Sequence, residues 1–427
     1  MSHTQERQSY HVRWFIDIHG VREDVTVTIE DGMVVGIASG RLVPSIDLGD
    51  VALIPGLVNA HTHLEFSLIE TPIPTNQRFT DWIRCVVGHR RSHPDSTRAA
   101  IRAGMDETIR SGTTLVGDIA TTGWGADDYL AVGFRGVVYQ ELLGLTEERI
   151  ASQLDVAQAR CKDSESFSAS FLLGLSPHAP YSVHPTLFQS SVETASHSAV
   201  PVAMHLAETQ AELELLADGT GEFREMLSDF GLWRERLFGG SCPMDYLSVL
   251  AKSPRSLVVH GNYLNEMELQ FLARQPAMTL VYCPRTHAAF GHRPHPWRRL
   301  LELGGSVAIG TDSRASNPDL SLFAELQFLA TLEPDLSHLE LLRLGTEAGR
   351  FALTGVTCQK STMLGKRRNS EMADRELADF CVVGWNSAIT ADPERNLFAS
   401  GNRVLATMIA GEWRFVAPEF LLNGALQ

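Results

Sequence analysis

The sequence contains no run of apolar residues long enough to cross a membrane, and it begins with a polar stretch, MSHTQERQSY. A membrane-spanning helix needs about 18 consecutive apolar residues, and a secretion signal needs an apolar core of roughly 7–15 residues. We therefore expect no membrane partner and no secretion. The expected location is the cytoplasm.

The chain is also short of positive charge. It carries 36 Lys and Arg residues against 51 Asp and Glu residues, for a formal net charge of −15. Proteins that bind nucleic acid or anionic membrane surfaces usually present an excess of basic residues. The charge balance therefore argues against a nucleic-acid partner.

Cysteine is sparse. The six cysteines are scattered and form no CxxC pair, so neither a disulfide framework nor a structural zinc knot is expected. This usage is typical of reduced thiols in the cytoplasm. Cys283 lies beside a candidate site segment, but we expect a buried small residue there and not a nucleophile.

Two histidines follow a buried strand in the stretch IPGLVNAHTHLEFS, residues 54–67. The apolar segments Val51–Ile54 and Leu57–Val58 are typical of a strand buried on both faces. His61 and His63 are two residues apart, so both rings lie on one face of the strand. They are half of a metal site or, alternatively, a pair of hydrogen-bonded polar residues.

Short strands with alternating apolar and polar residues occupy both ends of the chain. Because chain termini often lie close together, we predict one small discontinuous β-sandwich domain from residues 1–54 and 374–427. Residues 55–373 alternate strands with helices in eight units, which predicts an α/β fold, a (β/α)₈ TIM barrel. A doubly wound sheet is the alternative that strand counting leaves open.

The pattern also predicts the helices of this central region. They are expected at residues 97–110, 147–160, 185–197, 265–274 and 320–332, with two further helical stretches around 338–353. Residues 70–93, rich in Pro, Thr and Arg, are expected to be a mobile stretch. The insertion 218–246 is expected to cover one face of the barrel, and it offers a contact for a homodimer or larger homo-oligomer.

Residues of metal-ligand type fall at the ends of five predicted strands. In a (β/α)₈ barrel the chemistry lies at the C-terminal ends of the strands. In chain order these ends contribute His61, His63, His178, His205, Glu208, His260 and Asp312. We therefore predict a metal centre with imidazole and carboxylate ligands and an open position for water.

Each residue of this set has an expected role. The ligands of one divalent ion, Zn²⁺ with Fe²⁺ as the alternative, are expected to be His61, His63, His205 and Asp312. Water activated there gives its proton to Asp312, while His260 holds the hydroxide and polarises the substrate. Glu208 is near enough to protonate a ring nitrogen and then a leaving amine.

Four motifs, PGLVNAHTHLE, HLAE, VVHGN and GTDS, together resemble the amidohydrolase superfamily. Within it they are similar to the group that contains cytosine, guanine and S-adenosylhomocysteine deaminases and triazine chlorohydrolases. The resemblance covers nearly the whole chain and implies the same metal ligands, with Glu208 as proton shuttle. It also implies that His260 contacts the attacking water and that His178, in SPHAPYS, contacts a nucleoside.

Two features narrow the resemblance. Bimetallic relatives carry a modified lysine on strand four, and Phe171–Pro180 contains no lysine, which implies a single metal. Three segments resemble the aminofutalosine deaminase-like branch of the family: CPRTHAAF, GTDSRASNPDLS and FTDWI. This resemblance implies a 6-aminopurine nucleoside as substrate. Arg285 could then pair with a substrate carboxylate, and a loop salt bridge is the alternative.

Three other residues are candidate substrate contacts, each with a structural alternative. Trp82 stacks on a planar base or packs in a lid. Ser316 contacts substrate or caps a helix, and Glu65 lines the pocket or orients a ligand histidine. The spacing of three loop histidines matches no closed metal site, and we expect solvated or substrate-gating roles for His287, His292 and His295.

The expected function is that of a metal-dependent aminohydrolase acting on a small-molecule substrate. It removes ammonia from an aminated N-heterocycle, most specifically an adenine-type nucleoside such as aminofutalosine or S-adenosylhomocysteine. A chlorohydrolase or an amide or carbamate hydrolase would use the same metal site. A non-catalytic scaffold is disfavoured because every expected ligand is present.

Overall fold

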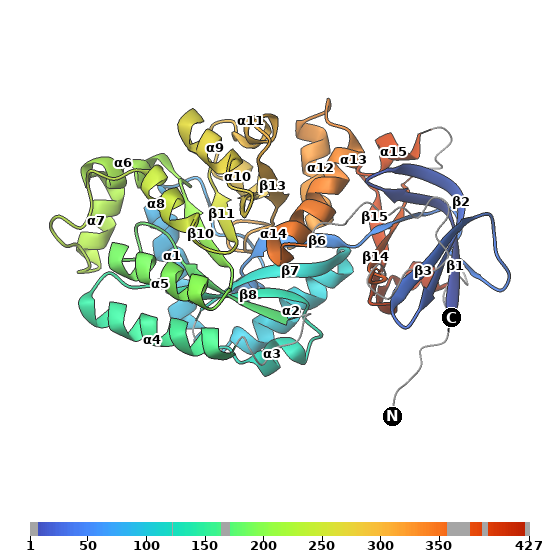
Figure 1. Cartoon of the computed structure of the whole chain (residues 1–427), viewed down its shortest axis with the longest axis horizontal. Helices are drawn as coiled ribbons and strands as arrows, with labels where there is room; N and C mark the ends of the chain where they lie inside the picture. The colour runs from blue at the N-terminus through green and yellow to red at the C-terminus, as the bar shows by residue number, and fades with distance from the viewer. Residues whose placement is uncertain (1–6, 122, 164–170, 357–375, 387–391, 423–427) are drawn as a thin grey trace.

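The structure is a computed structural model of the chain, shown in Figure 1. It describes residues 7–121, 123–163, 171–356, 376–386 and 392–422. None of the described helices is long and apolar enough to cross a membrane.

Eight parallel strands form the larger part of the molecule (Figure 1). They are β6 (Leu57–Thr62), β7 (Thr113–Ala120), β8 (Gly136–Leu142), β9 (Phe171–Pro177), β10 (Val202–Leu206), β11 (Ser256–His260), β12 (Met278–Tyr282) and β13 (Ser306–Ile309). Each pairs in parallel with the next along the chain. Thr62 bridges Asp312 in parallel and brings the first strand against the last. The predicted TIM barrel is therefore confirmed, and the doubly wound sheet is excluded.

Helices surround the barrel between these strands. They are α1 (Phe79–Ser92), α2 (Thr97–Arg110), α3 (Ala126–Leu130), α4 (Glu147–Asp163), α5 (Pro185–His197), α6 (Gln210–Asp218), α7 (Gly221–Asp229), α8 (Pro243–Leu250), α9 (Glu266–Ala273), α10 (Pro284–Ala289), α11 (Trp297–Glu302), α12 (Leu322–Leu332), α13 (His338–Arg343) and α14 (Gly349–Thr354). The helices predicted at 97–110 and 185–197 have those bounds. At the second, Pro185 occupies the first helical position, where its missing N–H costs nothing.

One sequence prediction is wrong: residues 70–93 include the 14-residue helix α1. Its apolar side chains Phe79 and Trp82 pack against Phe290 of a distant loop, with ring centroids 5.2 Å apart in each case. This burial stabilises a helix that the polar composition of the stretch conceals.

The insertion at 218–246 covers part of the barrel, as predicted. Phe223, Phe238 and other apolar side chains of this segment form one buried cluster with Phe79 of α1. Two ion pairs join the same elements, Arg78 to Glu225 at 2.8 Å and Arg84 to Asp229 at 2.7 Å. An oligomer contact on this segment stays a prediction.

A second sheet combines strands from both ends of the chain, on the right of Figure 1. It contains β1 (Gln8–Asp17), β2 (Gly20–Glu30), β3 (Met33–Ser39), β4 (Ile46–Asp47), β5 (Ala52–Pro55), β14 (Phe380–Gly384), β15 (Arg403–Ile409) and β16 (Glu412–Val416). The N- and C-terminal segments join where β5 pairs with β14. The discontinuous β domain is therefore confirmed.

This sheet folds over its own apolar core. Trp413 of β16 donates a hydrogen bond to Tyr10 of β1 at 3.2 Å, although β1 and β16 lie far apart in the strand order. The predicted N-terminal domain boundary stays a prediction. β5 ends at Pro55 and β6 begins at Leu57, so the chain passes directly between the two sheets. The predicted boundary at 373/374 lies outside the described residues.

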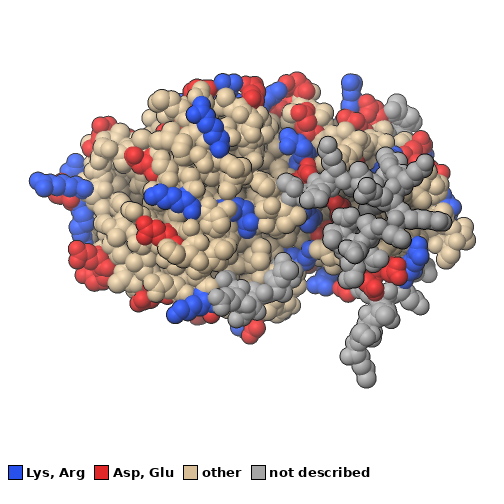
Figure 2. Space-filling model, in the orientation of Figure 1, with Lys and Arg blue, Asp and Glu red and all other residues tan. Residues whose placement is uncertain are grey.

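Charged side chains of the described residues are interspersed on the face shown in Figure 2. Lys and Arg lie beside Asp and Glu around much of the outline and do not gather in one basic region of this face. A nucleic-acid surface usually requires such a region.

Candidate active site

Side chains from three strand ends converge at one mouth of the barrel. His61 lies in β6 and His63 directly follows it, His205 lies in β10, and Asp312 follows β13. The Nε2 atoms of His63 and His205 are 3.3 Å apart. Asp312 Oδ1 lies 3.6 Å from His61 Nε2 and 3.7 Å from His63 Nε2. The structure thus brings together all four residues that the sequence predicts as metal ligands.

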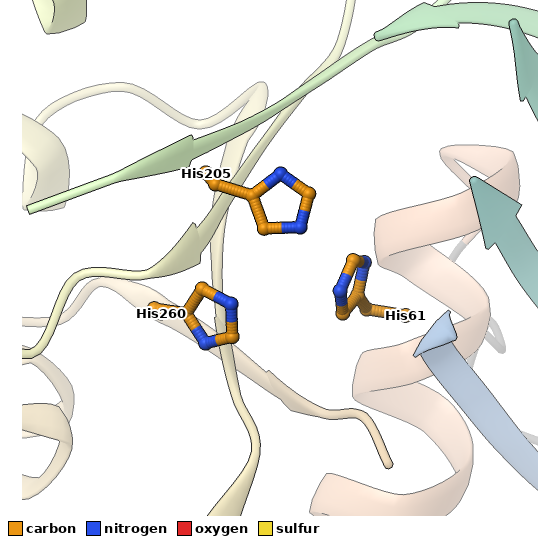
Figure 3. A group of neighbouring side chains, drawn as sticks. All are labelled: His61, His205 and His260. Atoms are coloured by element: carbon orange, nitrogen blue, oxygen red, sulfur yellow. The ribbon is translucent and has the colours of Figure 1, made fainter. Parts of the chain in front are cut away.

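His260, the last residue of β11, joins this group. Figure 3 shows the rings of His61, His205 and His260 around one common space. The candidate ligand atoms of these three residues lie within 4.8 Å of one another, as do those of His61, His63 and Asp312. The two sets overlap at His61, so they form one centre.

The ring nitrogens of this centre lack ordinary hydrogen-bond partners. Both nitrogens of His61 and Nδ1 of His63 are buried and bond to none of the residues that the structure describes. His205 Nδ1 lies 3.0 Å from the backbone oxygen of His178. Because a carbonyl oxygen only accepts, Nδ1 carries the proton and leaves Nε2 free to bind a metal. The donor set therefore fits a divalent ion that takes imidazole and carboxylate ligands.

The electrostatics of the centre favour metal binding. Burial lowers the pKa of His63, His205 and His260, so these rings stay neutral. Burial alone would raise the pKa of Asp312, but the adjacent His61 and His260 rings outweigh it and lower that pKa. Neutral imidazoles beside an ionised carboxylate are the protonation states that a metal requires.

Glu208 lies beside this centre, in the loop after β10. Its Oε1 is 3.4 Å from His260 Nε2. Burial raises the pKa of Glu208 well above its usual range, and the charges of Asp312 and Glu212 raise it further. A carboxyl group that is protonated at neutral pH can act as a general acid.

Three site residues sit in the left-handed backbone region, which non-glycine residues rarely adopt. The φ angles are 54° at Ala207, 68° at His260 and 60° at Asp312. Such a conformation costs on the order of 1–3 kcal/mol and persists only where surrounding contacts impose it. Ala207 directly follows β10, His260 ends β11 and Asp312 lies three residues after β13, so this backbone turns the site side chains toward the barrel mouth.

Glu212 imposes the first of these conformations. Its carboxylate accepts hydrogen bonds from the backbone N–H groups of Ala207, at 2.8 Å, and Glu208, at 2.9 Å. Asn262 donates to the backbone oxygen of Glu208 at 2.9 Å. The peptide groups around Glu208, the candidate general acid, are therefore held from both sides.

A histidine of the strand-seven loop supports His260. His295 Nε2 donates to the backbone oxygen of His260 at 2.7 Å, and its Nδ1 accepts from Trp297 N–H at 3.0 Å. His287 is also buried and bonds through Nε2 to the backbone oxygen of Arg293. The expectation of solvated side chains is therefore wrong for these two, because both rings are packed and hydrogen-bonded, and a substrate-gating role stays a prediction. The third, His292, is half-buried.

His178 and Trp82, two predicted substrate contacts, lie near the centre and in its cover respectively. The His178 ring centroid is 4.8 Å from that of His205, and its Nδ1 is 2.7 Å from Ser182 Oγ. Trp82 stacks on Phe79 of α1, and its Nε1 is buried with no partner in the described part of the chain. A substrate contact stays a prediction for both.

Arg285 is not free to bind a substrate carboxylate. Its Nε donates to Glu325 Oε1 and its Nη2 to Asp319 Oδ1, both at 2.7 Å. These ion pairs disfavour the predicted carboxylate-binding role, because two carboxylates of this chain already occupy the guanidinium. The salt-bridge alternative is the observed arrangement.

Ser316 and Glu65 also have partners within the chain. Ser316 Oγ donates to Asp312 Oδ2 at 2.9 Å, so it orients a candidate ligand, and Ser321 caps α12 instead. Glu65 accepts from Arg90 Nη2 at 2.5 Å and from Thr121 Oγ1 at 2.7 Å. A substrate contact stays a prediction for both residues. Cys283 is buried, as expected, and burial raises its thiol pKa.

Sequence reasoning missed Glu141, Glu212 and Arg90. Glu141 is the second-last residue of β8, so the rule that located His178 and His205 at strand ends would also have found it. Glu212 follows Glu208 by one helical turn but acts through backbone groups. Arg90 lies in the stretch expected to be mobile.

A sequence profile of the Amidohydrolase family matches residues 52–414. The chain belongs to the amidohydrolase family. The resemblance noted from four motifs is therefore confirmed.

Two relatives of this amidohydrolase are similar over most of their lengths. The 5-methylthioadenosine/S-adenosylhomocysteine deaminase of Pyrococcus furiosus is 29% identical over 350 residues, which cover 76% of each chain. The aminodeoxyfutalosine deaminase of Nitratiruptor is 28% identical over 311 residues, which cover 70% of this chain and 74% of the relative.

The fold is also similar to a solved structure. The Helicobacter pylori aminofutalosine deaminase in complex with methylthio-coformycin superposes with a TM-score of 0.79 at 22% identity. The superposition covers 96% of this chain and 100% of that one. At this identity the likeness shows the fold alone, a barrel with its accompanying β domain.

Proposed function

We propose that this amidohydrolase is a metal-dependent deaminase that hydrolyses an adenine-type nucleoside and releases ammonia. One observation carries the proposal: a buried acid of raised pKa, Glu208, lies 3.4 Å from His260 at the edge of the histidine and Asp312 cluster. An amine leaves badly as an anion, so deamination needs such an acid beside an activated water. The names of the two relatives support the substrate class.

One divalent ion would be held by His61, His63, His205 and Asp312. We favour Zn²⁺, because imidazole nitrogens and a carboxylate oxygen are its usual ligands in catalytic sites, and Fe²⁺ also suits this set. When bound, such an ion supplies Lewis acidity that lowers the pKa of water toward about 7.

The side chains then move protons in a balanced sequence. Asp312 accepts a proton from the attacking water, and His260 orients that water through Nε2. Glu208 gives its proton to the ring nitrogen beside the amino-bearing carbon. It then takes the proton of the new hydroxyl group and passes it to the amino group, which leaves as ammonia. Transfer of the proton held by Asp312 returns Glu208 to its acid form.

The test is ammonia release by metal-loaded protein. The panel contains adenosine, its 5′-methylthio, S-homocysteinyl and aminofutalosine derivatives, guanine, cytosine and an aminotriazine, with product masses measured alongside. We expect a product about one mass unit heavier than an adenine-type substrate. Glu208→Gln should abolish turnover while retaining the metal. Glu268→Gln, a buried glutamate in α9, is the control and should keep turnover.

Silence across this panel would refute the proposal. A chlorinated triazine, an amide and a carbamate would then test the alternative hydrolases that could use the same centre. A cytoplasmic location and a homodimer or larger assembly stay predictions from the sequence.

A further inference from the structure

Glu141 faces the interior of the barrel. Side chains two residues apart on a strand share a face. Val137 and Tyr139 of β8 belong to the apolar cluster that fills the barrel, so Glu141, two residues further, points the same way. The same alternation leads from Ala203 to His205 on β10. Glu141 therefore lies in the layer of side chains that carries the candidate metal ligands.

The neighbours of Glu141 leave one of its oxygens without a hydrogen bond. His178 Nε2 is 3.8 Å from its Oε1, and Arg90 Nη2 is 3.6 Å from its Oε2. Arg90 Nη2 instead donates to Glu65, at 2.5 Å. Oε2 of Glu141 is buried and has no hydrogen-bond partner in the part of the chain that the structure describes. A buried carboxylate oxygen in this position calls for a donor.

The local charge specifies the kind of donor. Two buried carboxylates, Glu65 and Glu141, share the single guanidinium of Arg90. An anionic group of a ligand would be repelled here, whereas a hydroxyl group would form a charge-assisted hydrogen bond. The burial of Glu141, only 3% exposed, does not disqualify it, because Glu208 and Asp312 are each 6% exposed.

The position of Glu141 selects the part of the substrate. The reacting groups Glu208, His260 and Asp312 come from the ends of β10, β11 and β13. Glu141 is the second-last residue of β8. His178 contacts it on one side, and the ring of His178 lies beside that of His205 on the other. A group held by Glu141 would therefore lie on the β8 side of the centre, separated from the reacting groups by His178. In an adenine-type nucleoside the remote part that bears hydroxyl groups is the sugar.

We propose that Glu141 contacts the substrate and sets its specificity by accepting a hydrogen bond from a sugar hydroxyl group. This inference rests on the proposed function and extends it, because it names a residue that selects ribonucleosides over their deoxy counterparts. Removing the hydroxyl group leaves the buried carboxylate unpaired, and removing the carboxylate leaves the hydroxyl group without its acceptor.

The experiment compares kcat/KM for the preferred nucleoside and its 2′-deoxy and 3′-deoxy counterparts. The wild type should lose about 10- to 100-fold on one of the deoxy substrates. Glu141→Met, which keeps the length of the side chain but has no acceptor oxygen, should lose a similar factor on the parent substrate and show no further loss on that deoxy substrate. Glu141→Gln retains a neutral acceptor and should keep part of the discrimination.

Glu268→Gln is the comparison variant, because Glu268 is a buried glutamate of α9 with no part in the proposed site. It should discriminate between the substrates as the wild type does. Wild-type discrimination in Glu141→Met, or no discrimination by the wild type itself, would overturn this inference alone. Loss of bound metal from both Glu141 variants would assign the residue to the metal centre and also overturn it. No deamination of any nucleoside by metal-loaded wild type would overturn the proposed function and this inference together.

Discussion

Glu212 offers the sharpest test of how the backbone positions Glu208, the proposed general acid. Its two carboxylate oxygens accept from the N–H groups of Ala207 and Glu208. In Glu212→Gln, one of these acceptors becomes an NH₂ group that faces an N–H donor. One buried N–H then loses its partner, and the left-handed conformation of Ala207 loses half of its support.

The losses of stability and of rate expected for Glu212→Gln can each be given an order of magnitude. Loss of one hydrogen bond to a charged group costs about 1.5–3 kcal/mol of stability. Displacement of a catalytic group by about 1 Å costs about 100-fold in rate. We therefore expect kcat for Glu212→Gln to fall roughly 30- to 100-fold, while KM changes by less than about 3-fold because Glu212 touches no substrate.

Glu268→Gln is the matched control. Glu268 is equally buried, and its carboxylate accepts the backbone N–H of Asn265 at 2.7 Å in α9, away from the candidate centre. Glu268→Gln should lose as much unfolding free energy as Glu212→Gln and keep the kcat of the wild type. The assays are steady-state kinetics, thermal unfolding and metal content. An equal fall of kcat in both variants, or unchanged kcat in Glu212→Gln despite its lower stability, would refute the positioning argument.

Three further outcomes are expected. Arg285→Met should lower the unfolding free energy by about 3 kcal/mol or more, because Glu325 is left buried without its cationic partner. KM for a carboxylate-bearing nucleoside should stay within about 2-fold of the wild type; a selective rise in that KM would show that Arg285 binds the substrate carboxylate despite the observed ion pairs. Removal of metal with a chelator should abolish turnover and lower the unfolding temperature, and added Zn²⁺ should restore both; turnover that survives complete removal would exclude the metal mechanism. Burial raises the pKa of Asp118 to about 8 and that of Glu212 to about 7. The folded chain therefore binds more protons than the unfolded chain above about pH 4. The unfolding free energy should fall as the pH rises from about 4 to 8. Urea unfolding at a series of pH values should show a smaller fall of the unfolding free energy in Asp118→Asn than in the wild type. Equal falls in the two proteins would exclude Asp118 as a source of the pH dependence.

The pattern of residues along the chain was sufficient to predict the barrel and the residues of its candidate metal centre. Strand periodicity fixes which residues end each strand, and parallel strands place those ends at one rim. The positions of His61, His205 and Asp312 follow from these two rules. The helix between residues 79 and 92 does not, because its stability comes from the distant Phe290.

The partners of individual side chains were less predictable. Arg285 is charged and lies near a strand end, which also describes a ligand-binding arginine, and only the fold shows that Glu325, 40 positions away, neutralises it. Ser316 follows Asp312 by four residues and bonds its carboxylate, an arrangement that depends on the left-handed turn at Asp312. Sequence spacing gives no sign of this turn, because aspartate adopts the left-handed conformation only occasionally.

The left-handed residues explain why the centre needs so many supporting side chains. Ala207, His260 and Asp312 would each relax to a common backbone conformation if released, and each relaxation would turn a site residue away from the barrel mouth. Three hydrogen-bonding side chains oppose this: Glu212 binds beside Ala207, His295 holds the carbonyl of His260, and Thr62 donates to the backbone oxygen of Asp312 at 2.9 Å. Because the supporting groups come from different segments, substitutions at any two should reduce activity independently. A double variant whose losses are less than additive would instead mean that the strand ends move as one unit.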